Sequence, residues 1–415
     1  MKKALCLLSL LVLSASDAWA GVQPVGPEFH ASTCASCRKW SAAVAGSASG
    51  AFAVAWEGTS TADSRGILAR FYTKTGAPRG KEVQANKDKD PAQYDANVAA
   101  DAQGNFIVAW SQVVDRNSDV YVQRFKATGV AVGAAVRVNV DAPGAPIAPS
   151  DALPAVAVTP NGGFLVAWVR LVLPSAGSEG TDPEIWFRRF DKNAKALGAP
   201  TKLNTGLVRG QRPSVCVSKA GQAVVSWSTV DGYFPFQPSK YGVALRRVAT
   251  SGAPSGAEVV VTPPRANVLE TAASCAPDGS HVVVWRTDLA PSTDESDLFG
   301  LRFNSKGKKV GAAFRINSSA PGEQRAPSIS HDAAGNFVVV WVTRDDTRRV
   351  IGRRYKANGT ADGADFTIYQ PGEDMPLPGD PKVAHVGKAG EFVVAWPVGS
   401  DDLVGRRFKA TATKK

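Results

Sequence analysis

The sequence predicts an all-β fold: a seven-bladed β-propeller with four-stranded blades, closed by the N-terminal strand pairing into the last blade. Three observations predict it. A tryptophan recurs at a nearly constant interval, four strand signals surround each tryptophan, and the last repeat lacks a strand that the N-terminus can supply. An open solenoid of seven units is the alternative, and it would leave sheet edges exposed.

The tryptophans define the repeat, because each ends a short apolar run. Successive members are 54 to 59 residues apart, and they are Trp56, Trp110, Trp168, Trp227, Trp285, Trp341 and Trp396. The interval is typical of propeller blades, each of which is buried on both faces by its neighbours.

Four strands, named a to d in chain order, are expected in each repeat. Strand a is often opened by proline, as at Pro154, and a glycine turn leads into strand b, the apolar run that ends at tryptophan. Strand c ends in arginine and a bulky residue, as in Arg302-Phe303, and strand d runs toward asparagine, as at Asn317. Strand b is apolar at successive positions, which favours a sheet covered on both faces.

The ends of the chain predict closure. After Arg407-Phe408 too few residues remain for a strand d, whereas Val25–His30 resembles the strand d at Val310–Arg315. Residues 25–31 are therefore expected to complete blade seven. The predicted organisation is a signal peptide at 1–20, one propeller at 21–410 and a short basic tail at 411–415.

The first twenty residues read as an export signal. Lys2 and Lys3 precede an apolar run, and Ala18-Trp19-Ala20 forms a cleavage site. We expect a periplasmic or secreted protein, without a membrane span and monomeric. The formal net charge is +11, which favours contact with anionic polymers or membrane surfaces, with a solvated basic surface as the alternative. Export makes intracellular nucleic acid an improbable partner.

At these residues the chain resembles the propeller-type repeats of large secreted bacterial proteins. The shared features are a Gly-Asn-Phe-Val-Val-Val-Trp core, as at 335–341, a following Arg-Phe and a final Val-Asn strand. The resemblance covers nearly all of 21–410. It implies export and a structural or binding role, and it supplies no catalytic residue.

Most candidate chemical groups have a structural interpretation. The strand-c arginines recur in every repeat, so we expect them to hold neighbouring blades together. His331 and His385 are expected to face opposite ways, and no spacing typical of a metal site or cofactor motif is present. We therefore expect no metal and no cofactor.

The mature chain has four cysteines. Cys34 and Cys37 are best interpreted as a local disulfide in an exported protein, with free thiols or a redox or metal role as alternatives. Cys216 and Cys275 lie 11 and 10 residues before their tryptophans. We expect opposed side chains and therefore two buried free thiols.

The longest b–c loops are predicted in blades three, four and five, and they contain aromatic and acidic side chains. The candidate ligand-binding residues are Tyr233, Phe234, Phe236, Tyr241, Asp182, Glu184, Asp294 and Asp297. Packing of the aromatic residues over the blade is the competing interpretation.

These features favour a non-catalytic binding protein that recognises a glycan, a cell-envelope polymer or a protein through the b–c loop face of blades three to five. The alternative is a hydrolase or lyase that acts on polysaccharide or peptide on a propeller scaffold. An enzyme would need two carboxylates that converge at a pocket floor.

Overall fold

The computed structural model describes residues 21–411, except 35, 60–64, 88–91, 115–116, 141–148, 172–182, 206–208, 232–239, 267, 289–294, 319–321, 346 and 373–374. These described residues form β-strands, and among them no helix is long and apolar enough to cross a membrane. The strands are gathered into six sheets, and each of the seven repeated tryptophans lies on an apolar strand inside one of them, two in a single eight-stranded sheet.

Four sheets contain four antiparallel strands each. The first consists of β3 (Lys39–Gly46), β4 (Phe52–Gly58), β5 (Gly66–Tyr72) and β6 (Val83–Gln84). The second consists of β7 (Gln93–Ala100), β8 (Phe106–Val114), β9 (Asn117–Phe125) and β10 (Ala131–Arg137). The third consists of β11 (Ser150–Val158), β12 (Phe164–Leu171), β13 (Glu184–Phe190) and β14 (Thr201–Lys202). The fourth consists of β15 (Arg209–Val217), β16 (Ala223–Asp231), β17 (Lys240–Val248) and β18 (Pro254–Ala266).

An eight-stranded sheet follows. It contains β19 (Val268–Cys275), β20 (His281–Asp288), β21 (Ser296–Phe303), β22 (Lys309–Arg315), β23 (Glu323–His331), β24 (Phe337–Arg344), β25 (Arg349–Tyr355) and β26 (Phe366–Tyr369). One parallel pair, Ser296 with Glu323, joins its two four-stranded halves. The prediction of an all-β fold made of four-stranded sheets is confirmed.

The last sheet joins the two ends of the chain. It contains β27 (Lys382–His385), β28 (Glu391–Val398) and β29 (Asp402–Ala410), and both β1 (Val22–Pro24) and β2 (Phe29–His30) pair antiparallel with β29. The N-terminal segment expected to be one strand at 25–31 is thus two short strands that begin earlier in the chain.

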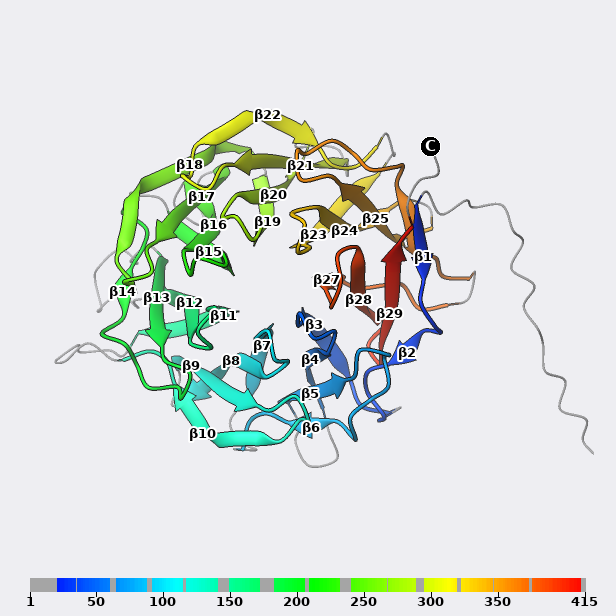
Figure 1. Ribbon diagram of the computed structural model, residues 1–415, viewed down its shortest axis with the longest axis horizontal. Coiled ribbons are helices and arrows are strands. Elements are labelled where there is room, and N and C mark those ends of the chain that lie inside the picture. Colours follow the sequence, from blue (N-terminus) through cyan, green and yellow to red (C-terminus); the bar gives the residue numbers. More distant parts are fainter. Residues whose placement is uncertain are drawn as a thin grey trace, which may run out of the picture.

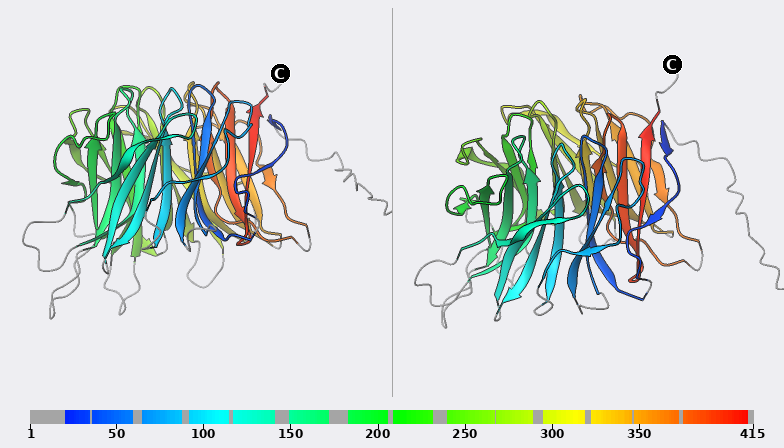
Figure 2. Two further views of the ribbon diagram at one scale, coloured as in Figure 1. Left: turned by 90° about the horizontal axis from the view of Figure 1, so that it is seen from below. Right: turned by 60° about the horizontal axis from the view of Figure 1, so that its bottom comes forward.

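The first strands of the sheets surround a common centre (Figure 1). These inner strands contact one another in the order β3, β7, β11, β15, β19, β23 and β27, and β27 contacts β3. Figure 2 shows the sheets side by side, with their strands running from one face of the molecule to the other. The apolar b strands are buried between neighbouring sheets; for example, Trp110 packs with Ala53 and Phe71 of the preceding sheet.

Polar side chains connect neighbouring inner strands. The backbone N–H of Val156 donates to Asn97 Oδ1 at 3.2 Å, and the N–H of Ala273 donates to Ser214 Oγ at 3.1 Å. At the outer side, Arg302 donates to the carbonyl of Ala357 at 3.0 Å, so a strand-c arginine reaches the neighbouring repeat, as its recurrence predicts.

The first repeat departs from this arginine pattern. Arg70 lies opposite Val54, two residues before its tryptophan, whereas Arg124 lies opposite Ile107, three residues before its own. Phe71 therefore takes the position that arginine has in the second repeat.

Two disulfides are present. Cys34 is bonded to Cys37, and Cys216 is bonded to Cys275, each pair with Cα atoms 5.4 Å apart. The expectation that Cys216 and Cys275 are free thiols is wrong. Cys216 and Cys275 lie on neighbouring sheets whose faces pack against each other. Their side chains point in opposite directions, each toward the facing sheet, and this brings the two sulfur atoms together.

Candidate active site

Each of six inner strands contains a β-bulge near its first residues. The register with strand b shifts by one residue within β3, β7, β11, β15, β19 and β23. These starts pair with the ends of the b strands, so all six bulges lie toward the face that carries the b–c connections. A bulge re-aims a side chain and is common beside active sites.

The bulge residue has a positive φ in five of these strands, although none of the five is glycine. The angles are 60° at Asp95, 56° at Leu153, 48° at Arg212, 49° at Glu270 and 51° at Ala326. Each residue lies 15 positions before the tryptophan of its repeat. A left-handed backbone costs a non-glycine residue about 1–2 kcal/mol, so strain is repeated at one structural position.

Side-chain chemistry at this position changes from repeat to repeat while the backbone stays the same. One repeat presents an acid, the next an apolar residue, the next a base and the next another acid. A position that served only the fold would be suited to glycine, which adopts a positive φ without steric cost. The variation therefore indicates that these side chains have individual roles.

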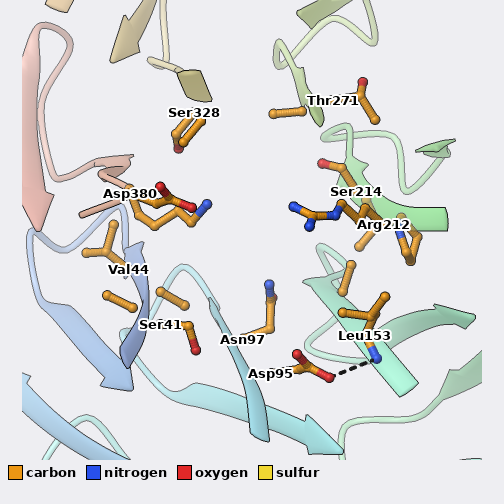
Figure 3. Close-up of a pocket in the computed structure, with 18 of the residues that line it drawn as sticks. Ser41, Val44, Asp95, Asn97, Leu153, Arg212, Ser214, Thr271, Ser328 and Asp380 are labelled. Carbon is orange, nitrogen blue, oxygen red and sulfur yellow. Dashed lines mark hydrogen bonds between the residues drawn. The ribbon is translucent and has the colours of Figure 1, made fainter. Parts of the chain in front are cut away.

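The bulge residues line one cavity of about 430 Å³ at the centre of the molecule. Asp95, Arg212 and Glu270 contribute charged groups from the bulges, and two more come from Lys382 at the start of β27 and from Asp380 just before it. In Figure 3, Arg212 and Asp380 extend into the cavity from opposite sides. Three carboxylates thus share one cavity, which is the arrangement that the sequence could not reveal.

Asp95 is held through one oxygen. Its Oδ2 accepts hydrogen bonds from Ser111 Oγ at 3.0 Å and from the N–H of Leu153 at 3.4 Å, the contact drawn in Figure 3. Within the described part of the chain, Oδ1 has no hydrogen-bond partner.

Burial raises the pKa of the Asp95 carboxyl above its usual value, and the negative charge of Glu57 acts in the same direction. The bonds from Ser111 and Leu153 oppose this shift without cancelling it. Asp95 is therefore suited to hold a proton and donate it.

Glu270 occupies the corresponding place in β19. Its Oε2 accepts a hydrogen bond of 2.6 Å from the N–H of Ala326, and Arg325 lies 3.8 Å from Oε1. Going around the cavity from β7 to β19, two inner strands intervene in one direction and three in the other. Asp95 and Glu270 therefore approach the cavity from opposite sides.

The loop residues singled out from the sequence take no part in this cavity where they are described. Tyr241 packs against the core between β17 and β19, Glu184 pairs with Lys202 at 2.6 Å, and Asp297 pairs with Arg315 at 2.6 Å. The remaining candidates lie outside the described residues: Tyr233, Phe234, Phe236, Asp182 and Asp294.

The described residues contain no group of three or more His, Cys, Asp or Glu side chains that could hold a metal ion. His331 and His385 lie at the other end of the inner strands, where their rings pack at a tilt against Phe337 and Phe392. They are the last residues of β23 and β27, whereas the cavity lies at the first residues of the inner strands, and neither histidine lines it.

No family model matches the chain, and no curated protein sequence matches it. Solved structures share its fold. A polysaccharide lyase described as an ulvan lyase bound to -[GlcA(1-4)Rha3S]- has a TM-score of 0.59 and 10% identity, over 92% of this chain and 96% of that one. A protein of unknown function from Dyadobacter fermentans has a TM-score of 0.55 and 14% identity, over 94% and 99%. An α-L-arabinofuranosidase from Fusarium graminearum has a TM-score of 0.50 and 10% identity, over 90% and 93%.

These similarities correct the main functional expectation. A non-catalytic binding protein that acts through the loops of blades three to five was expected, but similar solved structures include polysaccharide lyases, an α-L-arabinofuranosidase and an α-L-arabinanase. The expectation was wrong because it relied on loop length, whereas the carboxylates that share a cavity come from strands far apart in the sequence.

Proposed function

We propose that this protein is a glycoside hydrolase that cleaves a polysaccharide inside the central cavity. The observation that carries the proposal is the presence of two bulge carboxylates, Asp95 and Glu270, on opposite sides of one cavity. Glycosidases use such a pair as general acid and as base or nucleophile.

In this reaction Asp95 donates the proton on its free Oδ1 to the glycosidic oxygen. Glu270 takes a proton from water as the water oxygen attacks the anomeric carbon, and the bond to the leaving sugar breaks. The placement of the two carboxylates across the cavity favours an inverting reaction, because inverting enzymes keep room for water between them. Among the described residues that line the cavity there is no histidine or tyrosine to act as the base of a lyase.

The experiment measures new reducing ends and unsaturated products after incubation of the purified protein with a panel of plant, algal and bacterial polysaccharides. Asp95→Asn and Glu270→Gln should each lower kcat by about 10²- to 10⁴-fold. Asp101→Asn is the matched control, because Asp101 holds a turn through Asn105 and does not line the cavity. Thermal melting of all variants shows whether they fold.

Reducing ends without unsaturated products support the hydrolase. Unsaturated products at equal yield would identify a lyase and overturn the assignment of Asp95 and Glu270. Wild-type kcat in both folded variants would remove them from the reaction.

We also propose that the sheets form seven blades whose ring is completed by the N-terminal strands, and that the protein is exported. The pairing of β1 and β2 with β29 and the contact between β27 and β3 support the ring. The signal predicted at residues 1–20 supports export, and it would bring the protein to extracellular polysaccharides.

A further inference from the structure

Arg212 is an unpaired cation in the cavity. Its side chain is exposed, and among the described residues it makes no hydrogen bond or ion pair. Other arginines near the cavity are neutralised: Arg65 pairs with Glu57 at 2.6 Å, and Arg286 pairs with Glu323 at 2.8 Å. Arg212 therefore makes no polar contact that would stabilise the fold.

The backbone fixes Arg212 at a cost. Its φ of 48° is strained for a residue with a Cβ, and Pro213 follows it directly. The equivalent positions of the flanking repeats hold Leu153 and Glu270, so the bulge does not itself require arginine. The unpaired guanidinium thus extends from a strained backbone position and is available to a ligand that arrives from solution.

We infer that Arg212 binds an acidic group of the substrate, so that the polysaccharide cleaved here carries uronate carboxylates or sulfate esters. A guanidinium can donate two parallel hydrogen bonds to either group. Arg212 lies on β15, between the strands of Asp95 and Glu270 on the shorter arc of the cavity wall. The acidic group therefore belongs to a sugar beside the bond that is cleaved. This inference rests on the proposed function.

The test measures binding by calorimetry in the Asp95→Asn background, so that cleavage does not consume the probe. The probes are an oligogalacturonate, its carboxyl-reduced neutral counterpart and a sulfated galactan oligosaccharide. Removing a charge-assisted contact with Arg212→Ala should weaken binding of the preferred acidic probe by about 10- to 100-fold, and it should leave the neutral probe unaffected. Arg212→Lys should restore part of the loss.

Leu153→Ala is the matched control, since it alters the same bulge position in the adjacent repeat without changing charge. The carboxylate and sulfate probes distinguish the two sources of acidity. Equal affinity for acidic and neutral probes, or equal losses in the Arg212→Ala and Leu153→Ala variants, overturns the acidic subsite.

Failure of the inference and failure of the proposed function have different signatures. If the protein cleaves a polysaccharide but Arg212→Ala keeps the preference for acid, the inference is wrong and the hydrolase stands. If Arg212→Ala abolishes acidic binding but no polysaccharide is cleaved, the subsite stands and the hydrolase is wrong.

Discussion

The two ends of the inner strands differ in what their side chains do. At the cavity end the bulges present charged side chains on a strained backbone, such as the exposed Arg212 and the half-buried Glu270. At the other end, His331 and His385 are half-buried, and the disulfide of Cys216 and Cys275 joins β15 to β19. One set of strands thus carries charged side chains that line a cavity at one end and packed or disulfide-bonded side chains at the other.

If the cavity is the active site, as we propose, this difference separates the groups used for function from those used for stability. Strained backbone persists only where the surrounding structure enforces it. Here the buried far end and the core between the sheets hold strands whose cavity ends would relax if they were free. Substitutions at either end should therefore leave the other end unchanged, which can be measured.

Acidification should produce the largest effect, and at the far end. Burial lowers the pKa of His331 to about 3 and those of His281 and His385 to about 4. In the unfolded chain these histidines bind protons below about pH 6.5, so the unfolded state takes up more protons. Stability is therefore complete above about pH 6.5 and falls as the pH decreases toward 4, by about 2–3 kcal/mol for His281 alone at pH 4.5.

Urea unfolding at pH 7 and pH 4.5 measures this loss. His281→Phe is the informative variant, because His281 stacks on Phe303 and its Nε2 has no partner among the described residues. The variant should reduce the difference in free energy of unfolding between the two pH values by about 2–3 kcal/mol. An unchanged difference would mean that His281 is protonated in the folded state.

The disulfides offer a second, smaller test of the far end. Cys216 and Cys275 close a segment with a sequence separation of 59, whereas Cys34 and Cys37 are separated by 3. Restriction of the unfolded chain predicts a loss of about 4 kcal/mol for the double alanine variant of the first pair and about 2 kcal/mol for that of the second. Urea unfolding of both variants gives the order. A larger loss for the local disulfide would contradict a structural role at the far end.

Much of the fold could be predicted because the same pattern of strand signals occurs seven times in the sequence. Trp110 and its equivalents fix the b strands, and the arginine of strand c predicts a contact with the next repeat, which Arg302 makes with Ala357. The disulfide of Cys216 and Cys275 could not be predicted from their offsets to tryptophan. Side chains on the same face of one sheet must point the same way to meet, whereas side chains on two facing sheets must point in opposite directions.

The site could not be predicted because its members are far apart in sequence and its main signal is a backbone angle. Asp95 and Glu270 look like ordinary acidic residues at the start of strands. One signal was available: reading the residue 15 positions before each tryptophan gives Ser41, Asp95, Leu153, Arg212, Glu270, Ala326 and Pro381. Such variation inside a regular repeat marks positions that the fold does not determine.

The smallest expected effect tests the strain at the cavity end. Arg212→Gly removes both the side chain and the Cβ that makes a φ of 48° unfavourable. Relief of about 1–2 kcal/mol of strain is partly offset by the entropy that glycine adds to the unfolded chain, about 0.5–1 kcal/mol. We expect the free energy of unfolding to rise by about 0.5–1 kcal/mol. Arg212→Ala removes the same functional group but keeps the Cβ, so it should leave the free energy of unfolding near that of the parent.

Urea unfolding of the glycine and alanine variants measures the strain, because the two differ only in the Cβ. Both variants should lose the preference for acidic probes equally. A glycine variant less stable than the alanine variant would show that the bulge is not strained, and that its side chains need no functional reason to be there.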